Sequence, residues 1–304
     1  MSAGVAGVRV RVPASSANLG AGFDALGLAL GLHDVVEVRR TPNPGLVVRV
    51  SGEGAEDVAL DESHLVVRAL LAACSRLDTA PGGLELTCAN AIPHARGLGS
   101  SAAAVVAGIA AGYGLAGVAL TGAALDDALH LAAEFEGHAD NVAASLLGGL
   151  VLAWCEESDG DRRFRAARVE PHPDLRPVAI VPREQSATHV TRGLLPEVVP
   201  HADAAFAAGR AALAVHAVSA RPDLLLPATA DSLHQDYREK AWPDSLRVVR
   251  ALRAHGVAAA ISGAGPTVLA LTAGTALPQA VDLGGFTVLP LPLDRTGVVV
   301  DPLG

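Results

Sequence analysis

The chain has 304 residues, a formal net charge of −9 and only 3% aromatic residues, so it can form two domains with cores built mainly from Ala, Val and Leu. The acidic balance argues against general binding of nucleic acid or of an anionic membrane, because both require a basic field. Three scattered cysteines predict neither a disulfide framework nor a zinc site, and the opening residues lack the pattern of a signal peptide, so we expect a cytoplasmic protein.

Alternating residues predict the first strand. The run VRVRV at 8–12 has the period of a strand with one buried face, and Pro13 is expected to end it before the turn SSANLGAGFDALG. The elements expected next are strands at LALGLHDVVEVRR (28–40) and LVVRV (46–50), a helix over about 63–77 and a strand over 83–90.

Residues 93–104, PHARGLGSSAAA, are a glycine-rich turn that leads into a run of alanines. Backbone N–H groups at the start of a helix are unpaired and carry partial positive charge, so Gly97 to Ser101 could surround a polyphosphate without a side-chain cation. The lysine of G-x-x-x-x-G-K-[ST] is missing, and Ala102 stands where G-x-G-x-x-G requires glycine. Taken alone, the segment fits either a phosphate site or a tight turn capped by serine.

The segment 101–121 carries no charge and places Gly108 and Gly112 at the spacing of paired transmembrane helices. Its second half is rich in glycine, which weakens a helix by about 1 kcal/mol per residue. Much of the rest is alanine, which is only weakly apolar. We therefore expect no membrane span here.

The second half of the chain begins after a helix over 121–136, which has Leu125, Leu129 and Ala132 on one face. The polar stretch EESDGDRR (156–163) is interpreted as the boundary between two domains, 1–160 and 161–304. The elements expected beyond it are a strand at PVAIVP (177–182), alanine-rich helices, a strand-turn-strand at VAAAISGAGPTVLALT (257–272) and a closing strand near TGVVV (296–300). Interleaved strands and helices indicate an α/β or α+β protein in two halves.

Two other segments are unusual, PASSANLGAGFDALGLAL (13–30) and ISGAGPTVLAL (261–271). Together with PHARGLGSSAAA they resemble, in order and spacing, the three motifs of the GHMP kinases, and they extend over nearly the whole chain. Within that family the first motif is most similar to P-A-S/T-x-A-N-L-G-x-G-F-D-x-L-G of the homoserine kinases. The segment EGHADNVAASLLGG (136–149) also resembles theirs.

The resemblance implies an α+β, two-domain GHMP kinase architecture. Its N-terminal, ATP-binding domain is like domain 2 of ribosomal protein S5, its C-terminal domain is ferredoxin-like, and the active site lies between them. The implied enzyme moves a phosphoryl group from ATP to the hydroxyl of L-homoserine with Mg²⁺, a step toward threonine. Its partners are then two small molecules, and the oligomeric state is left open, a homodimer included.

The same resemblance assigns the nucleotide and metal sites. The residues implied for ATP are Pro93, Arg96, Gly97, Leu98, Gly99, Ser100, Ser101 and Ala102. Proteins typically hold Mg²⁺ with one or two carboxylates, aided by phosphates and water. Alignment with the family favours Glu136, with Ser100, as the metal ligands, and Glu134 is close enough to be the alternative.

A site for homoserine needs an anion for its ammonium group and cations for its carboxylate. By resemblance, Asn18 and Asp24 contact the hydroxyl and the ammonium, while Arg192 in THVTRGLLP and Arg238 in LHQDYR match family arginines. A guanidinium suits a carboxylate because it donates two parallel hydrogen bonds. The expected lining is completed by His138, Asn141, Thr188 and Gly263. The predicted catalytic set is Asn18, Asp24, Glu136, Asn141 and Thr188.

Three positions depart from the family pattern. His64 in ESHLVVRA stands where the family often has asparagine, which leaves a specific adenine contact open, and Ala139 and Asp236 replace prolines. No general base is assigned. Asp140 lies in the H-x-D-N segment where one would be sought, and direct passage of the proton to the phosphate is the alternative.

Two other functions remain as alternatives. A GHMP kinase for another small alcohol, such as mevalonate or a cytidyl-linked sugar alcohol, would have no use for paired arginines facing an acidic residue. A catalytically silent relative commonly lacks the loop serines or the metal carboxylate, and here Ser100, Ser101 and Glu136 are all present.

Overall fold

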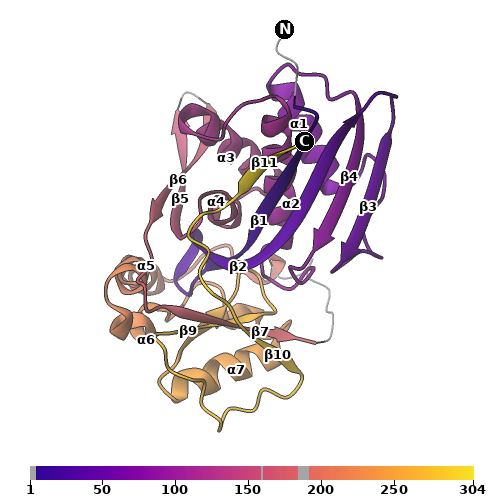
Figure 1. Ribbon diagram of the computed structural model, residues 1–304. Helices are drawn as coiled ribbons and strands as arrows, with labels where there is room; N and C mark the ends of the chain where they lie inside the picture. The colour runs from indigo at the N-terminus through magenta and orange to yellow at the C-terminus, as the bar shows by residue number, and fades with distance from the viewer. Residues whose placement is uncertain (1–4, 159, 184–191) are drawn as a thin grey trace.

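The computed structural model describes residues 5–158, 160–183 and 192–304. Within these residues the chain forms one sheet of seven strands and one of four, each with helices packed against it (Figure 1). The larger unit consists of β1 (Gly7–Asn18), β2 (Gly22–Thr41), β3 (Leu46–Gly52), α1 (Leu65–Arg76), β4 (Gly83–Asn90), α2 (Ser100–Leu115), α3 (Gly122–Glu136), α4 (Asp140–Leu147), β5 (Leu150–Ser158), β6 (Asp161–Val169) and β11 (Val299–Leu303).

The seven-stranded sheet runs in the order β11-β1-β2-β4-β3, and β5 joins β2 and carries β6. All pairs are antiparallel except β3 with β4. Helices α2 and α4 pack on β1 and β2, while α1 packs on α2. The predicted alternation in the first strand is confirmed, because Val8, Val10 and Val12 all belong to the core under these helices.

The first strand continues past Pro13, where the sequence predicts its end. β1 runs to Asn18, and its pairing with β2 shifts register between Pro13 and Ala14 and again next to Asn18. Proline has no N–H for a ladder hydrogen bond, and such irregularities are where a strand accommodates it. Only residues 19–21 remain as a turn, so Asn18 and Asp24 lie close together on either side of it.

The uncharged segment 101–121 packs inside the larger unit. Helix α2 is buried over most of its length, and its residues Gly108 and Gly112 face α1. A Cβ added to Gly108 would lie 2.3 Å from the carbonyl oxygen of Val66, and one added to Gly112 would lie 2.6 Å from the Cβ of Ala73. The glycine pair therefore allows two helices of one chain to approach closely. Among the helices that the structure describes, none combines the length and hydropathy that a bilayer span requires.

The polar stretch 156–163 includes the ends of β5 and β6, which pair as a hairpin, whereas the sequence predicts a domain boundary there. β5 and β6 pair from Leu150 opposite Val169 to Ser158 opposite Asp161, and both belong to the larger sheet. β11 returns to the same sheet beside β1. A division between 160 and 161 would therefore cut a hairpin. The chain passes from the larger sheet to the smaller one after β6, because the next strand along the chain pairs in the four-stranded sheet. Hairpin ends and linkers have similar polar composition, so composition alone does not separate them.

The smaller unit lies between β6 and β11 in the chain. Its elements are β7 (Arg176–Pro182), η2 (Arg192–Leu194), α5 (His201–Ser219), η3 (Pro222–Leu224), α6 (Leu225–Ala228), η4 (Asp236–Arg238), α7 (Pro243–Ala254), β8 (Ala258–Ile261), β9 (Val268–Thr272) and β10 (Phe286–Pro290). The antiparallel order is β10-β7-β9-β8. Ferredoxin-like units follow the pattern β-α-β-β-α-β. Here helices fill the first crossover, while residues 273–285 in the second contain no helix.

The two units share a core. On one face of the smaller sheet, Trp242 and Leu246 of the α7 region pack with Ile180 in a cluster of their own. Ala179 and Val181 of the same strand β7 belong instead to the core of the larger unit. The smaller sheet is thus held against the larger one, and the turn between β8 and β9 reaches the first motif.

Candidate active site

The three motifs of the sequence meet at one place in the structure. The Ser262 hydroxyl of the third motif donates to the Gly97 carbonyl of the second, and its oxygen lies 2.8 Å from the Ser16 hydroxyl of the first, within hydrogen-bond distance. The Gly263 N–H donates to the Ala17 carbonyl at 3.1 Å. The expected glycine turn between β8 and β9 therefore does pack on the loop before α2.

Two glycines shape the loop before α2. Gly97 and Gly99 have φ of +80° and +71°, a region that favours glycine. A Cβ on Gly97 would lie 2.6 Å from the Ser262 carbonyl oxygen, and one on Gly99 would lie 2.1 Å from the Ser15 hydroxyl. Both positions therefore require glycine on two grounds, backbone conformation and space.

Helix α2 begins directly after this loop. Gly99 is its N-cap and no side chain caps the helix there, so the first N–H groups from Ser100 onward keep the partial positive charge of a helix start. The Ser100 hydroxyl accepts a long hydrogen bond from the Ala95 N–H at 3.4 Å. The unpaired N–H groups at this helix start can therefore bind an anion without a lysine side chain.

A cavity of about 550 Å³ opens at this helix start. It is lined by most of the residues that the sequence predicts for the site, namely Asn18, Asp24, Gly97, Gly99, Ser100, Ser101, Ala102, Glu136, His138, Asn141, Arg238 and Gly263. These residues come from both units of the fold. The structure therefore gathers side chains that lie up to 245 positions apart, as the hydrogen bond from the Asn18 amide to the Gly263 carbonyl shows.

Other predicted residues lie elsewhere. Leu98 is fully buried, and neither it nor Pro93 lines the cavity. The Arg96 guanidinium donates to the carbonyls of Pro182 and Arg183 at the end of β7, so it joins the two units and does not line the cavity. Thr188 lies outside the described residues. For Arg192 the structure gives only its backbone, at the first position of η2.

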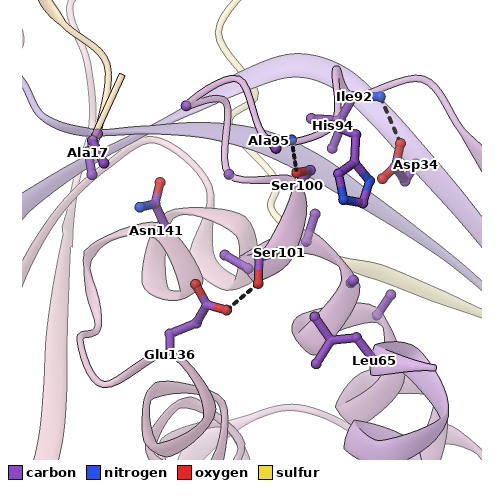
Figure 2. A pocket seen from close by; sticks show the side chains of 18 of the residues that line it. Ala17, Asp34, Leu65, Ile92, His94, Ala95, Ser100, Ser101, Glu136 and Asn141 are labelled. Carbon is purple, nitrogen blue, oxygen red and sulfur yellow. Dashed lines mark hydrogen bonds between the residues drawn. The ribbon is translucent and has the colours of Figure 1, made fainter. Parts of the chain in front are cut away.

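One carboxylate is paired with the loop serines. The Ser101 hydroxyl donates to Oε1 of Glu136 at 2.5 Å (Figure 2). The side chain of Glu134, the alternative, is 56% exposed, lies beside His130 and does not line the cavity. Glu136 thus contacts Ser101 and not Ser100, its predicted partner in metal binding. In the described part of the chain, no three His, Cys, Asp or Glu side chains lie together as a group of metal ligands.

The segment after α3 is organised around a buried carboxylate. Asp140 is 1% exposed, and its Oδ1 lies 2.7 Å from Nδ1 of His138 and accepts the Asn141 N–H at 2.7 Å. The Asn141 amide oxygen in turn accepts the Ser15 hydroxyl at 3.0 Å. Through these two contacts, Asp140 holds His138 and Asn141 in position beside the cavity.

The opposite wall carries the predicted substrate contacts. Asn18, at φ +73°, donates to the Gly263 carbonyl at 2.9 Å and accepts the Asp24 N–H at 3.0 Å. Arg238 is 2% exposed, and its guanidinium carbon lies 5.8 Å from the centre of the Phe23 ring. The Asn18 carboxamide is thus fixed at one end of the turn of residues 19–21, and Asp24 and Arg238 line the cavity beside it.

A second group of polar residues lines the cavity on the far side of the helix start. Figure 2 shows Asp34, His94 and Leu65 on one side of Ser100 and Ser101, with Glu136 and Asn141 on the other. Burial raises the pKa of the Asp34 carboxyl, although it accepts the N–H groups of Ala91 and Ile92 at 2.7 and 2.9 Å. These hydrogen bonds anchor the chain just before the glycine loop.

His64 also lines this end of the cavity. Its side chain is 6% exposed, and its Nδ1 makes no hydrogen bond within the described residues. Burial lowers the pKa of His64, which favours the neutral imidazole. A buried polar atom without a partner is costly, so the Nδ1 atom is available to a ligand that enters here.

Sequence reasoning missed Asp34, His94 and Ser15. A charged residue inside the otherwise apolar strand pattern around Asp34 was the available signal, since such residues are rarely buried without a partner. For Ser15, the signal was its place in the first motif. His94 gave none beyond its position in the loop segment.

Comparison with known proteins agrees with this geometry. The GHMP kinases N terminal domain matches residues 64–149, and the GHMP kinases C terminal domain matches 212–281. A homoserine kinase of Streptomyces coelicolor is 53% identical over 303 residues, 98% of this chain and 96% of its own. One of Rhodococcus opacus is 54% identical over 87% of each chain. The crystal structure of homoserine kinase from Cytophaga hutchinsonii superposes with a TM-score of 0.83 at 25% identity, covering 99% of both chains. The α+β, two-domain prediction is confirmed, and the chain belongs to the GHMP kinase family, in its homoserine kinase branch.

Proposed function

We propose that this protein transfers the γ-phosphoryl group of ATP to the hydroxyl of L-homoserine, giving O-phospho-L-homoserine and ADP on the way to threonine in the cytoplasm. The observation that carries the proposal is the single cavity that joins an uncapped helix start to Asn18, Asp24 and Arg238. The identity of 53% to a homoserine kinase over nearly the whole chain supports the same substrate. A homodimer is part of the proposal by family resemblance, and sedimentation velocity measures it.

The phosphates of ATP belong at the start of α2. Gly97 and Gly99 leave room for a close approach to the backbone, and the unpaired N–H groups from Ser100 onward supply positive potential in an otherwise acidic protein. The Asp34 and His64 end of the cavity then receives the nucleoside. The arrangement explains how the loop works without the usual phosphate-loop lysine.

The residues beside the loop also fit a divalent cation. Magnesium prefers hard oxygen ligands and keeps several waters, so one or two protein oxygens suffice together with phosphate oxygens. Glu136 and a loop serine, Ser101 by its present contact or Ser100 by family alignment, would hold it. When bound, Mg²⁺ supplies charge neutralisation at the phosphates.

The amino acid belongs at the other wall. Arg238 suits the α-carboxylate, Asp24 suits the ammonium group, and Asn18 suits the hydroxyl. His138 and Asn141, held by Asp140, border the space between this wall and the phosphates. By family alignment Arg192 is a second carboxylate partner and Thr188 a neighbour of the hydroxyl.

These positions direct an in-line displacement. The homoserine oxygen forms a bond to the γ-phosphorus while the bond from that phosphorus to the bridging oxygen breaks, ADP leaves, and the hydroxyl proton passes to an oxygen of the transferred phosphoryl group. Phosphoryl transfer needs alignment and charge stabilisation more than covalent help from protein. We assign Asp140 a positioning role, because it already accepts hydrogen bonds inside the protein, and we assign no general base.

A coupled assay of ADP release tests the proposal. The acceptors compared are homoserine, mevalonate, galactose and shikimate at equal concentration with ATP and Mg²⁺. We expect stimulation by homoserine above the others. Stimulation by a different alcohol alone would identify another kinase of the family. If none of the four acceptors stimulated ADP release, the proposed activity would be defeated.

A further inference from the structure

His234 is fully buried where the two units meet, beside the amino-acid end of the cavity. Its Nε2 lies 2.9 Å from the carbonyl oxygen of Gly20, in the turn between β1 and β2. Its Nδ1 lies 2.7 Å from Nη1 of Arg238, one turn further along. The imidazole thus bridges the first motif and the arginine.

The chemistry of these partners fixes the tautomer. A carbonyl oxygen only accepts hydrogen bonds, so Nε2 must carry the proton, and a guanidinium only donates, so Nδ1 must offer its lone pair. The ring is therefore neutral. The charged groups around it are Arg238 and Asp231, whose Oδ2 lies 3.7 Å from Nε2 and accepts the N–H groups of His234 and Gln235. Burial lowers the pKa of His234, in keeping with a neutral ring.

The arginine is held by more than this one contact. Nη1 of Arg238 also donates to the Gly263 carbonyl at 3.1 Å, so both N–H bonds of that nitrogen have acceptors. Two acceptors in fixed positions set the plane of the guanidinium. The Phe23 ring, 5.3 Å from the His234 ring and 5.8 Å from the guanidinium carbon, closes the arrangement.

We infer that His234 is a positioning residue for the substrate carboxylate. Its Nδ1 lone pair orients Arg238, and its Nε2–H donates to the Gly20 carbonyl in the turn that precedes Asp24. The carboxylate contact of the amino acid is then set by one buried ring before the substrate enters. The inference rests on the proposed function, because Arg238 must meet a carboxylate.

Two substitutions separate the two nitrogens. In His234→Asn the amide oxygen can replace Nδ1 as acceptor for Arg238, and the contact with Gly20 is lost. In His234→Gln the longer amide can donate to the Gly20 carbonyl, and the acceptor for Arg238 is lost. Each variant gives up one buried hydrogen bond, so both melting temperatures should fall, and each variant serves as the other's control for a general loss of stability.

We expect the KM for homoserine to rise about tenfold or more in His234→Gln and to stay within about threefold of wild type in His234→Asn, since a hydrogen bond to a charged group is at stake. The KM for ATP should change little in both. Equal KM values for homoserine in the two variants, with active wild-type protein, would overturn the positioning role alone. Wild-type protein with no homoserine-dependent ADP release would instead overturn the proposed function.

A measurement on wild-type protein keeps the inference testable if a variant does not fold. In protein labelled with ¹⁵N-histidine, the His234 ring should show a protonated Nε2 and an unprotonated Nδ1 from pH 6 to 8. A protonated Nδ1 would contradict the orientation of Arg238 described above.

Discussion

The hydroxyl of Ser101 donates to the carboxylate of Glu136 at 2.5 Å across 35 positions of sequence, which joins the start of α2 to the end of α3. Glu136→Gln keeps the size of the side chain and removes its charge. We expect kcat to fall by about 100-fold or more, because a charge that organises phosphates and metal is lost. Steady-state kinetics over a magnesium titration measures the effect.

Glu134→Gln is the matched control, since Glu134 lies two residues away with its side chain 56% exposed. Its kinetics should stay within about twofold of wild type, as for most exposed substitutions. A large loss of activity in Glu134→Gln, with Glu136→Gln active, would reverse the assignment of the carboxylate.

The glycine before α2 gives a second prediction. Gly99→Ala should destabilise the protein and abolish most ATP use, because the added Cβ meets the Ser15 hydroxyl at 2.1 Å. Gly117→Ala is its control, with a nearly identical φ of +72° and no atom within 4 Å of the added Cβ. The unfolding free energy of the control should fall only by the conformational cost of a left-handed alanine, about 1 to 2 kcal/mol, and its activity should be kept. Thermal melts and KM for ATP compare the two.

The two walls of the cavity should respond separately. Arg238→Lys keeps the charge but not the forked donors, so we expect the KM for homoserine to rise by about tenfold or more with little change in KM for ATP. Ser101→Ala should show the reverse pattern, impaired ATP use with homoserine binding retained. Arg247→Lys, on the exposed side of α7, controls for the substitution itself. If Arg238→Lys impaired ATP use and Ser101→Ala impaired homoserine binding, the assignment of the two ends of the cavity would be reversed.

The buried imidazole of His64 predicts a pH dependence of stability. Its folded pKa lies below the ordinary histidine value of about 6.5, so between the two values the unfolded chain binds more protons. The contribution of His64 to the unfolding free energy should therefore be fully retained above the ordinary pKa of about 6.5. It should be lost as the pH falls from there through the folded pKa, with a slope of at most about 1.4 kcal/mol per pH unit for this group.

Urea unfolding between pH 5 and 8 measures this slope in wild type and in His64→Gln. The variant should lose part of the slope, whereas His255→Gln, at an exposed histidine, should keep the wild-type slope. Identical slopes in wild type and His64→Gln would show that His64 does not titrate with unfolding.

Much of the site could be predicted because its motifs carry local reasons for their residues. Gly97 and Gly99 are needed where the backbone turns and another segment comes close, and the periodic helix over 121–136 matches α3 at Gly122–Glu136. Resemblance added the order of the three motifs. Together these placed most of the predicted residues on one cavity.

The rest depends on partners that are distant in sequence. In the sequence, Asp34 resembles an outward-facing charge in a strand. Its burial is stabilised by the N–H groups of Ala91 and Ile92, which are 57 and 58 positions away and donate to its carboxylate. His234 likewise finds its acceptor 214 positions away, at Gly20. The pairing of β11 with β1, across almost the whole chain, is a third such distant contact that composition does not reveal.

The return of β11 to the larger sheet bears on how the protein is made. Until residues 299–303 leave the ribosome, β1 has an open edge on the side that β11 will cover, with unpaired N–H and C=O groups. The larger unit therefore stays unfinished while the smaller unit is being synthesised, and its open strand edge is exposed during that period.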